Sequence, residues 1–142
     1  MVAIMEPLIP VPDAPAAPSA TPANGALTEV CGEVAAAFRR VWGRGPMRTS
    51  AHWAGPDIII VVLQNGHTDA EKALRAAGYI QQLLEGRELL QTILEHELKE
   101  IVERATGRRV VTVLSATRLD PDLSAETFLL ESQRERSLSS IQ

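Results

Sequence analysis

The chain has 142 residues, 45% of them hydrophobic, and a formal net charge of -4; this indicates one globular core and argues against a nucleic-acid-wrapping protein. A single cysteine, Cys31, excludes an intramolecular disulfide. The longest apolar run, Ile58 to Leu63, is far shorter than the ~20 residues of a membrane-spanning helix, and the first residues lack the pattern of a secretory signal. We therefore expect a cytoplasmic protein that does not insert into a membrane.

Prolines are spread among alanines in the N-terminal segment, from Pro7 to Pro22. Proline lacks a backbone donor and favours extended conformers, so residues 1–25 are predicted to form a disordered Pro/Ala-rich tail. The spacing is loose for a motif that a proline-binding partner would recognise, and a solvated linker is the favoured interpretation. Residues 132–142, rich in charge and serine, are predicted to be a flexible C-terminal tail.

The folded domain, residues 26–131, is predicted to begin with a helix. Apolar residues recur at helical spacing from Leu27 to Trp42, and a Gly-Arg-Gly-Pro turn then ends the helix. A strand from about Met47 to Trp53 and the apolar strand Ile58 to Leu63 would form a β-hairpin. Because the second strand has no alternating polar residues, we expect it to be central and covered on both faces.

A second helical region follows a capping box made by Thr68 and Glu71. Apolar residues continue at helical spacing as far as Val102, which predicts one long helix, bent or broken near Gly86. A helix of that length overhangs a four-stranded sheet, and its surplus apolar surface predicts a homodimer. We expect the face that carries Ile93 to be buried.

Two further strands are predicted at Arg109 to Ser115 and Thr127 to Glu131. The polar loop between them contains Asp120-Pro121-Asp122, which is typical of a turn. The element order α-β-β-α-β-β therefore defines a single α/β (α+β) domain with a sheet packed against helices. The order of the strands within the sheet stays open.

Side chains able to carry chemistry are few. The three histidines, His52, His67 and His96, show no paired spacing typical of a metal site, so we expect no metal and no cofactor. Charges of the second helix alternate in sign, which is typical of a solvated face. Because no catalytic pair is evident, we expect no catalytic residues and no enzyme activity. An enzyme would need residues such as His67, Glu71 and Arg87 to converge in a closed pocket, which their sequence separation neither shows nor forbids.

Two turns are candidates for binding a partner or an anion. The glycine-rich turn superficially resembles a phosphate loop but lacks its Lys-Ser/Thr ending, and the second turn lies beside free helix amides that attract anions. The plainer interpretations are a helix end whose arginines complement the helix dipole and a solvated loop histidine. The candidate residues are Gly43, Arg44, Gly45, Pro46, His67, Thr68, Glu71 and Arg87.

The order and spacing of several short motifs resembles the MpsC family, small proteins named for a Na+-translocating membrane-potential-generating system. The motifs extend over Leu27 to Glu131 and are Gly43-x-Gly45-Pro46, Asp57 before the apolar strand, Gly66-x-Thr68-x-x-Glu71-Lys72-x-Leu74, Thr106-Gly107-Arg108-x-Val110, Asp120-Pro121-Asp122 and Glu126-x-Phe128-x-Leu130-Glu131. The chain departs from the family pattern at His67 and Asp69, where leucine and proline are expected, and in its proline-rich tail. These departures argue against this chain binding a partner or ligand identical to that of other family members.

The resemblance implies a non-enzymatic accessory or regulatory protein beside a membrane complex, either an ion or bicarbonate-type transporter or a system that generates a membrane potential. Its partners would be subunits of that complex and a second copy of the chain. The alternative is a small-molecule or RNA-binding α/β domain, because the element order and the glycine-rich turn are similar to small RNA-binding folds. The acidity of the chain argues against nucleic acid as a partner.

Overall fold

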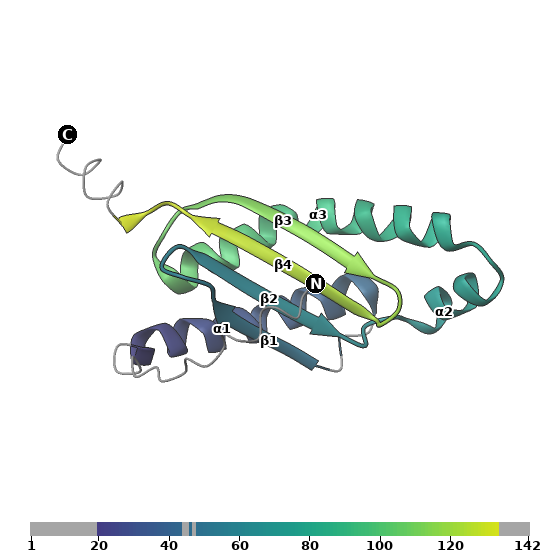
Figure 1. Ribbon diagram of the computed structural model, residues 1–142, viewed down its shortest axis with the longest axis horizontal. Helices are drawn as coiled ribbons and strands as arrows, with labels where there is room; N and C mark the ends of the chain where they lie inside the picture. Colours follow the sequence, from purple (N-terminus) through teal and green to yellow (C-terminus); the bar gives the residue numbers. More distant parts are fainter. Residues whose placement is uncertain (1–19, 44–45, 47, 134–142) are drawn as a thin grey trace, which may run out of the picture.

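The computed structural model describes residues 20–43, 46 and 48–133. These residues form three helices and four strands, in the predicted α+β order with the second helical region divided in two (Figure 1). The elements are α1 (Ala20–Trp42), β1 (Arg48–Trp53), β2 (Ile58–Gln64), α2 (Asp69–Ala76), α3 (Ile80–Thr106), β3 (Val110–Arg118) and β4 (Leu123–Leu130). Helix α1 therefore includes residues 20–25, which were predicted as tail; residues 1–19 and 134–142 lie outside the described residues.

The four strands form one antiparallel sheet in the order β1-β2-β4-β3. The predicted hairpin of β1 and β2 is confirmed, and the Ala54 amide closes its turn by donating to the Ile58 carbonyl at 2.8 Å. Strands β3 and β4 form a second hairpin around Asp120 to Asp122. Strands β3 and β4 are both longer than the sequence predicted, because the alternation of inward and outward residues continues through polar positions such as Thr117 and Ser124.

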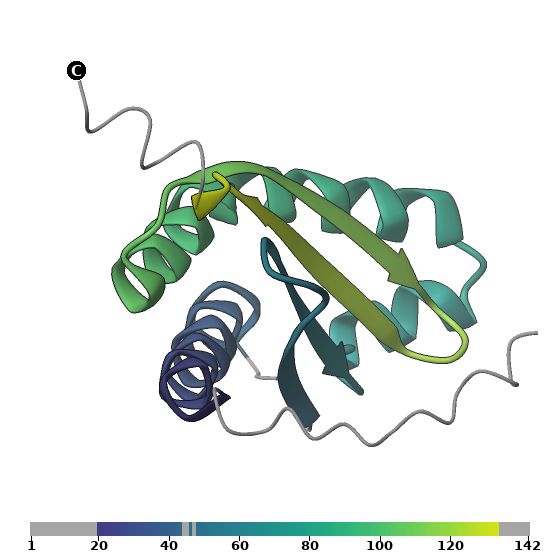
Figure 2. The same cartoon turned by 60° about the vertical axis from the view of Figure 1, so that its left-hand side comes forward.

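Helices α1 and α3 lie side by side against one face of the sheet (Figure 2). The core between the two layers consists of Val30, Val34, Ala37, Phe38, Ile59, Val61, Leu63, Leu94, Leu98, Ile101, Val102, Val110, Phe128 and Leu130. On β2, the alternate residues Ile58, Ile60 and Val62 point to the other face and are only half-buried. The expectation that both faces of β2 are covered is therefore wrong for the described residues, none of which forms a layer on that side.

The second helical region breaks at Gly78, whose φ of 90° lies in the left-handed region that suits glycine. The predicted break near Gly86 is wrong, because α3 runs through that residue without interruption. Helix α3 ends at Gly107, a left-handed cap whose amide donates to the Glu103 carbonyl. Its N-terminal end and α2 project past the end of the sheet (Figure 1).

Apolar residues occupy more than one face of α3. The buried stripe consists of Leu83, Arg87, Gln91, Leu94, Leu98, Ile101 and Val102. Ile93 lies on another face and is 69% exposed in the single chain, so packing within the domain does not bury it. Two polar residues take places in the buried stripe instead, and both belong to the polar sites described below.

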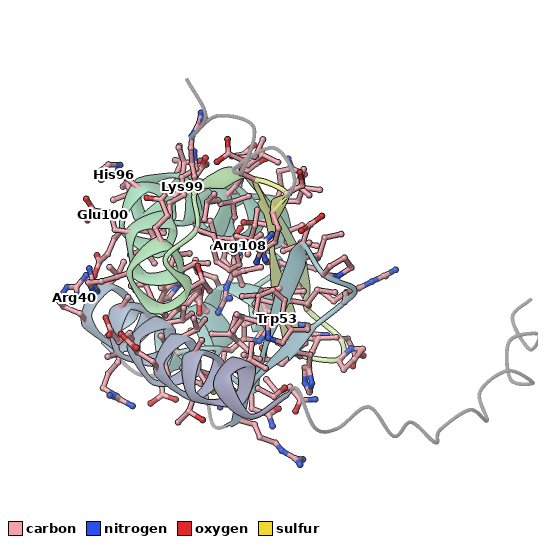
Figure 3. The ribbon with its side chains drawn as sticks, turned by 90° about the vertical axis from the view of Figure 1, so that its left-hand side faces the viewer. Arg40, Trp53, His96, Lys99, Glu100 and Arg108 are labelled. Carbon is pink, nitrogen blue, oxygen red and sulfur yellow. The ribbon has the colours of Figure 1, made fainter. Side chains whose placement is uncertain are left out.

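The outer side of the helical layer is charged. Arg40 of α1 pairs with Glu97 of α3, and Arg104 of α3 pairs with Glu33 of α1 at 2.6 Å. His96, Lys99 and Glu100 of α3 point away from the sheet, whereas Arg108 lies over the ring of Trp53 in β1 (Figure 3). The alternating charges of α3 thus form the solvated face that the sequence indicates.

Candidate functional site

The candidate residues converge at one end of the sheet, where the ends of α1 and β2 meet the start of α2. Gly66 lies so close to Pro46 that a side chain at Gly66 would contact its Cα at 3.7 Å. Gly43 ends α1 with a φ of 80°, whereas Arg44 and Gly45 lie outside the described residues. The turn before α2 is therefore packed against the turn after α1.

Thr68 and Glu71 form the predicted capping box at the start of α2. The Glu71 amide donates to Thr68 Oγ1 at 3.1 Å, and the Thr68 amide donates to Glu71 Oε1 at 3.0 Å. Both amides would otherwise be free at a helix start. Two of the amides at this helix start are thus satisfied by the chain's own side chains.

The Glu71 carboxylate is also bound by Arg87 of α3. Arg87 donates through Nε to Glu71 Oε2 at 2.8 Å and through a terminal nitrogen to Oε1 at 2.9 Å, the two-pronged geometry that favours an arginine–carboxylate pair. Their side chains are only 5% and 12% exposed. Burial alone would raise the pKa of Glu71, but hydrogen bonds from Arg87 and Thr68, together with the Arg87 charge, lower it.

Trp42, at the end of α1, completes this ion pair. Its indole N–H donates to Glu71 Oε2 at 3.3 Å, and the Arg87 guanidinium lies 5.4 Å from the centre of its ring. Arg87 also donates to the Gly66 carbonyl at 3.4 Å. One carboxylate and one guanidinium therefore connect α1, α2, α3 and the turn before α2.

His67 is buried, so its interpretation as a solvated loop histidine is wrong. Its amide donates to Asp122 Oδ2 at 2.9 Å, and its Nδ1 lies 3.1 Å from the same oxygen. Burial lowers the pKa of His67 against the opposing effect of the Asp122 charge. The Asp120 to Asp122 turn was predicted from its residue types, but nothing in the sequence shows that Asp122 would reach a histidine in a different turn.

Two spaces adjoin these residues. A cavity of about 10 Å³, lined in part by Phe38, Trp42 and Arg87, holds one water molecule at most. A shallow groove of about 280 Å³ lies above the ion pair, lined by Val41, Trp42, Thr68, Glu71, Leu74, Gln82, Leu83, Gly86, Arg87 and Leu90. This groove, called here the α2–α3 groove, is mainly apolar and has the Glu71–Arg87 pair at its base.

A second polar site lies between α3 and the β3–β4 hairpin, and the sequence analysis missed it. Glu126 of β4 is 0% exposed; its carboxylate accepts hydrogen bonds from Ser115 and, at 3.3 Å, from Gln91. Burial, opposed by the Ser115 hydrogen bond, raises the pKa of Glu126 to about 7. The available signal was an acidic residue at an inward position of an alternating strand.

The described residues contain no group of three or more His, Cys, Asp or Glu side chains that could hold a metal ion. Within the same part of the chain, no helix has both the length and the apolar character needed to cross a bilayer. His67, Glu71 and Arg87 do converge, and Glu71 and Arg87 bind each other at the base of the α2–α3 groove.

The fold is an α+β domain in which two helices cover one face of a four-stranded antiparallel sheet, with a closed ion-pair site at one end. The chain belongs to the MpsC family: the family model described as "Na+-translocating membrane potential-generating system (MpsC)" matches residues 26–132, most of the chain. The resemblance found in the motifs is thereby confirmed. Comparison with curated proteins and with solved structures gave no match.

Proposed function

We propose that this chain is a non-enzymatic, homodimeric accessory protein of the cytoplasm that binds a subunit of a membrane ion-translocating system through the α2–α3 groove. The family description supports the membrane-potential setting. The Glu71–Arg87 pair at the base of the groove supports a binding role over a catalytic one. Each of these charges is held by groups of the same chain, whereas a catalytic acid or base needs access to a substrate proton.

The observation that carries the proposal is the combination of an apolar groove wall with a fixed, charged base. Leu74, Leu83 and Leu90 line the wall, and Leu74 is 39% exposed. Apolar walls with a few fixed polar groups favour an amphipathic segment of a partner, which buries its apolar side and aligns its polar atoms with the base. The ion pair holds α2 against α3 and so preserves the shape of the groove.

Gly86 offers a way to block the groove without disturbing the core. A Cβ added there meets no atom within 4 Å, and the residue is in the middle of α3 with ordinary helical backbone. Gly86→Trp would fill the groove, and Gly86→Ala is the matched control because it adds one methyl group. Alanine should also stabilise the domain by about 1 kcal/mol through its better helix propensity.

The test measures sodium-dependent membrane potential with a voltage-sensitive dye in cells that lack the chain and are complemented with each variant. We expect the wild type and Gly86→Ala to restore the potential and Gly86→Trp to fail, with all three proteins folded by circular dichroism. A deletion that leaves the potential unchanged contradicts the setting. Full activity of Gly86→Trp contradicts the groove as the binding surface.

A further inference from the structure

Strand β3 is an edge of the sheet that lacks most of the features that protect edges. Among the described residues it pairs with β4 alone. It has nine residues, and before Arg118 it contains no charge, proline or glycine. Such side chains normally stop an unpaired row of N–H and C=O groups from recruiting another strand; β3 has only a bulge near Val110. Leu114 and Val111 are 66% and 48% exposed.

The opposite edge of the sheet differs from β3. Strand β1 has six residues and carries Arg48 and His52. Helix α1 packs against β1, and one β1 carbonyl, that of Thr49, accepts a hydrogen bond from the Cys31 thiol at 3.2 Å. The β1 edge is therefore shorter than β3 and carries charge, so β3 is the longer and less protected edge of the sheet.

The chemistry of β3 favours a second copy of the same strand as its partner. Leu114 is the midpoint of Val110–Arg118, so an antiparallel pair centred on it places Leu114 opposite Leu114 and Val113 opposite Ser115. No like charges oppose each other within this register, which matters for two chains that each carry a net charge of -4. A two-fold axis closes the assembly at two copies.

Helix α3 is compatible with this arrangement. Gln91 donates to Thr117 Oγ1 at 3.1 Å, and the Val110 amide donates to Glu103 at 2.8 Å. The stretch of α3 beside the middle of β3 therefore lies between residues 91 and 103. Within that stretch Glu95 forms an ion pair of 3.6 Å with Lys99, so the charge of this glutamate is offset within its own helix.

We propose that β3 pairs antiparallel with β3 of a second copy, centred on Leu114, to form a continuous eight-stranded sheet. The inference rests on the proposed homodimer and adds the surface that makes it. The long helix, from which the sequence predicts the dimer, would then flank the interface rather than form it.

The first experiment measures the solution mass of the full chain and three variants by light scattering over a range of concentrations. Leu114→Lys places a charge on the β3 edge at an exposed side chain. Ile93→Lys is the matched control on the exposed face of α3, and Ile60→Lys is the control on the open face of the sheet. We expect a dimer for the wild type and both controls, and at least tenfold weaker association for Leu114→Lys.

The second experiment tests the register by oxidative cross-linking in a Cys31→Ser background. Directly opposed residues in an antiparallel pair have Cα atoms about 4.5–5.5 Å apart, within reach of a disulfide. We therefore expect Leu114→Cys to form a covalent dimer. Val111→Cys should not, because its symmetry mate would lie about 20 Å away along the strand.

Each other result overturns the inference in a recognisable way. A wild-type monomer at all concentrations contradicts the homodimer itself, while the groove test above still stands. A dimer broken by Ile93→Lys or Ile60→Lys but not by Leu114→Lys assigns the interface to α3 or to the open sheet face. Cross-linking that is equal at positions 111 and 114 contradicts the register.

Discussion

Two glutamates of the described residues, Glu71 and Glu126, are withdrawn from water in different surroundings: the Glu71 side chain is 12% exposed and Glu126 is fully buried. Glu71 faces a guanidinium, which binds both of its oxygens. Glu126 has neutral donors, the Ser115 hydroxyl and the Gln91 amide, and its charged neighbour, Glu95, has the same sign. Burial raises the pKa of both carboxyls, but a cationic partner reverses the effect for Glu71 and leaves Glu126 with a pKa of about 7.

The comparison shows that a cationic partner keeps a largely buried acid ionised, whereas deeper burial without such a partner raises the pKa of the acid. The Glu71 site stays ionised at neutral pH and fixes the relative positions of three helices. The Glu126 site exchanges a proton near neutral pH and links the packing of the β3–β4 hairpin against α3 to pH. Substitutions at these two sites and at an exposed ion pair test this difference.

Removing the cation from the Glu71 site should have the largest effect. Arg87→Met leaves a buried carboxylate without its opposite charge, and breaking a buried ion pair typically costs about 3–5 kcal/mol. We expect a loss of unfolding free energy of that size in urea denaturation. The control is the double variant Glu71→Gln with Arg87→Met, which removes both charges and keeps a residue able to complete the capping box. It should recover a large part of the loss, and equal destabilisation by the single and double variants would contradict the ion pair as the source.

Glu126→Gln should remove a dependence of stability on pH. The folded pKa of Glu126, about 7, exceeds its ordinary value of 4.5, so the folded protein retains a proton that the unfolded chain releases. Its contribution to stability is therefore complete below pH 4.5, falls as the pH rises to about 7 and is constant above that. We expect the difference in unfolding free energy between wild type and variant to change by roughly 2–3 kcal/mol between pH 5 and pH 8.

The difference between the two proteins isolates Glu126 from the other groups that titrate in this range. The lowered pKa of His67 gives a slope of opposite sign, but it is present in both proteins and cancels. Parallel stability curves for wild type and Glu126→Gln would show that Glu126 does not hold the extra proton.

An exposed ion pair should give the smallest effect. Arg104 and Glu33 are in contact at 2.6 Å, but their side chains are 58% and 40% exposed, so water screens their attraction. We expect Arg104→Ala to reduce the unfolding free energy by less than about 1 kcal/mol, measured by the same denaturation. A loss as large as that of Arg87→Met would contradict the assignment of ion-pair strength to burial.

The sequence determined the α+β element order, the first hairpin, the capping box and the family. These features depend on neighbours within a few residues: helical spacing from Leu27 to Trp42, turn residues at Ala54 to Asp57, and the three-residue separation of Thr68 and Glu71. The break in the second helical region was misplaced because Gly78 and Gly86 are alike in sequence. Only the left-handed backbone at Gly78 distinguishes them.

Tertiary structure alone decided the strand order and both polar sites. Arg87 binds Glu71, which is sixteen residues away in sequence, and Asp122 binds His67, which is fifty-five residues away. Periodicity carries no information over such sequence separations. The burial of Glu126 likewise depends on α3 lying across β4 and on hydrogen bonds from Gln91 and Ser115. Local spacing sets which face of an element is apolar, but the pKa of a buried group is set by side chains that only the packed fold brings within a few ångströms.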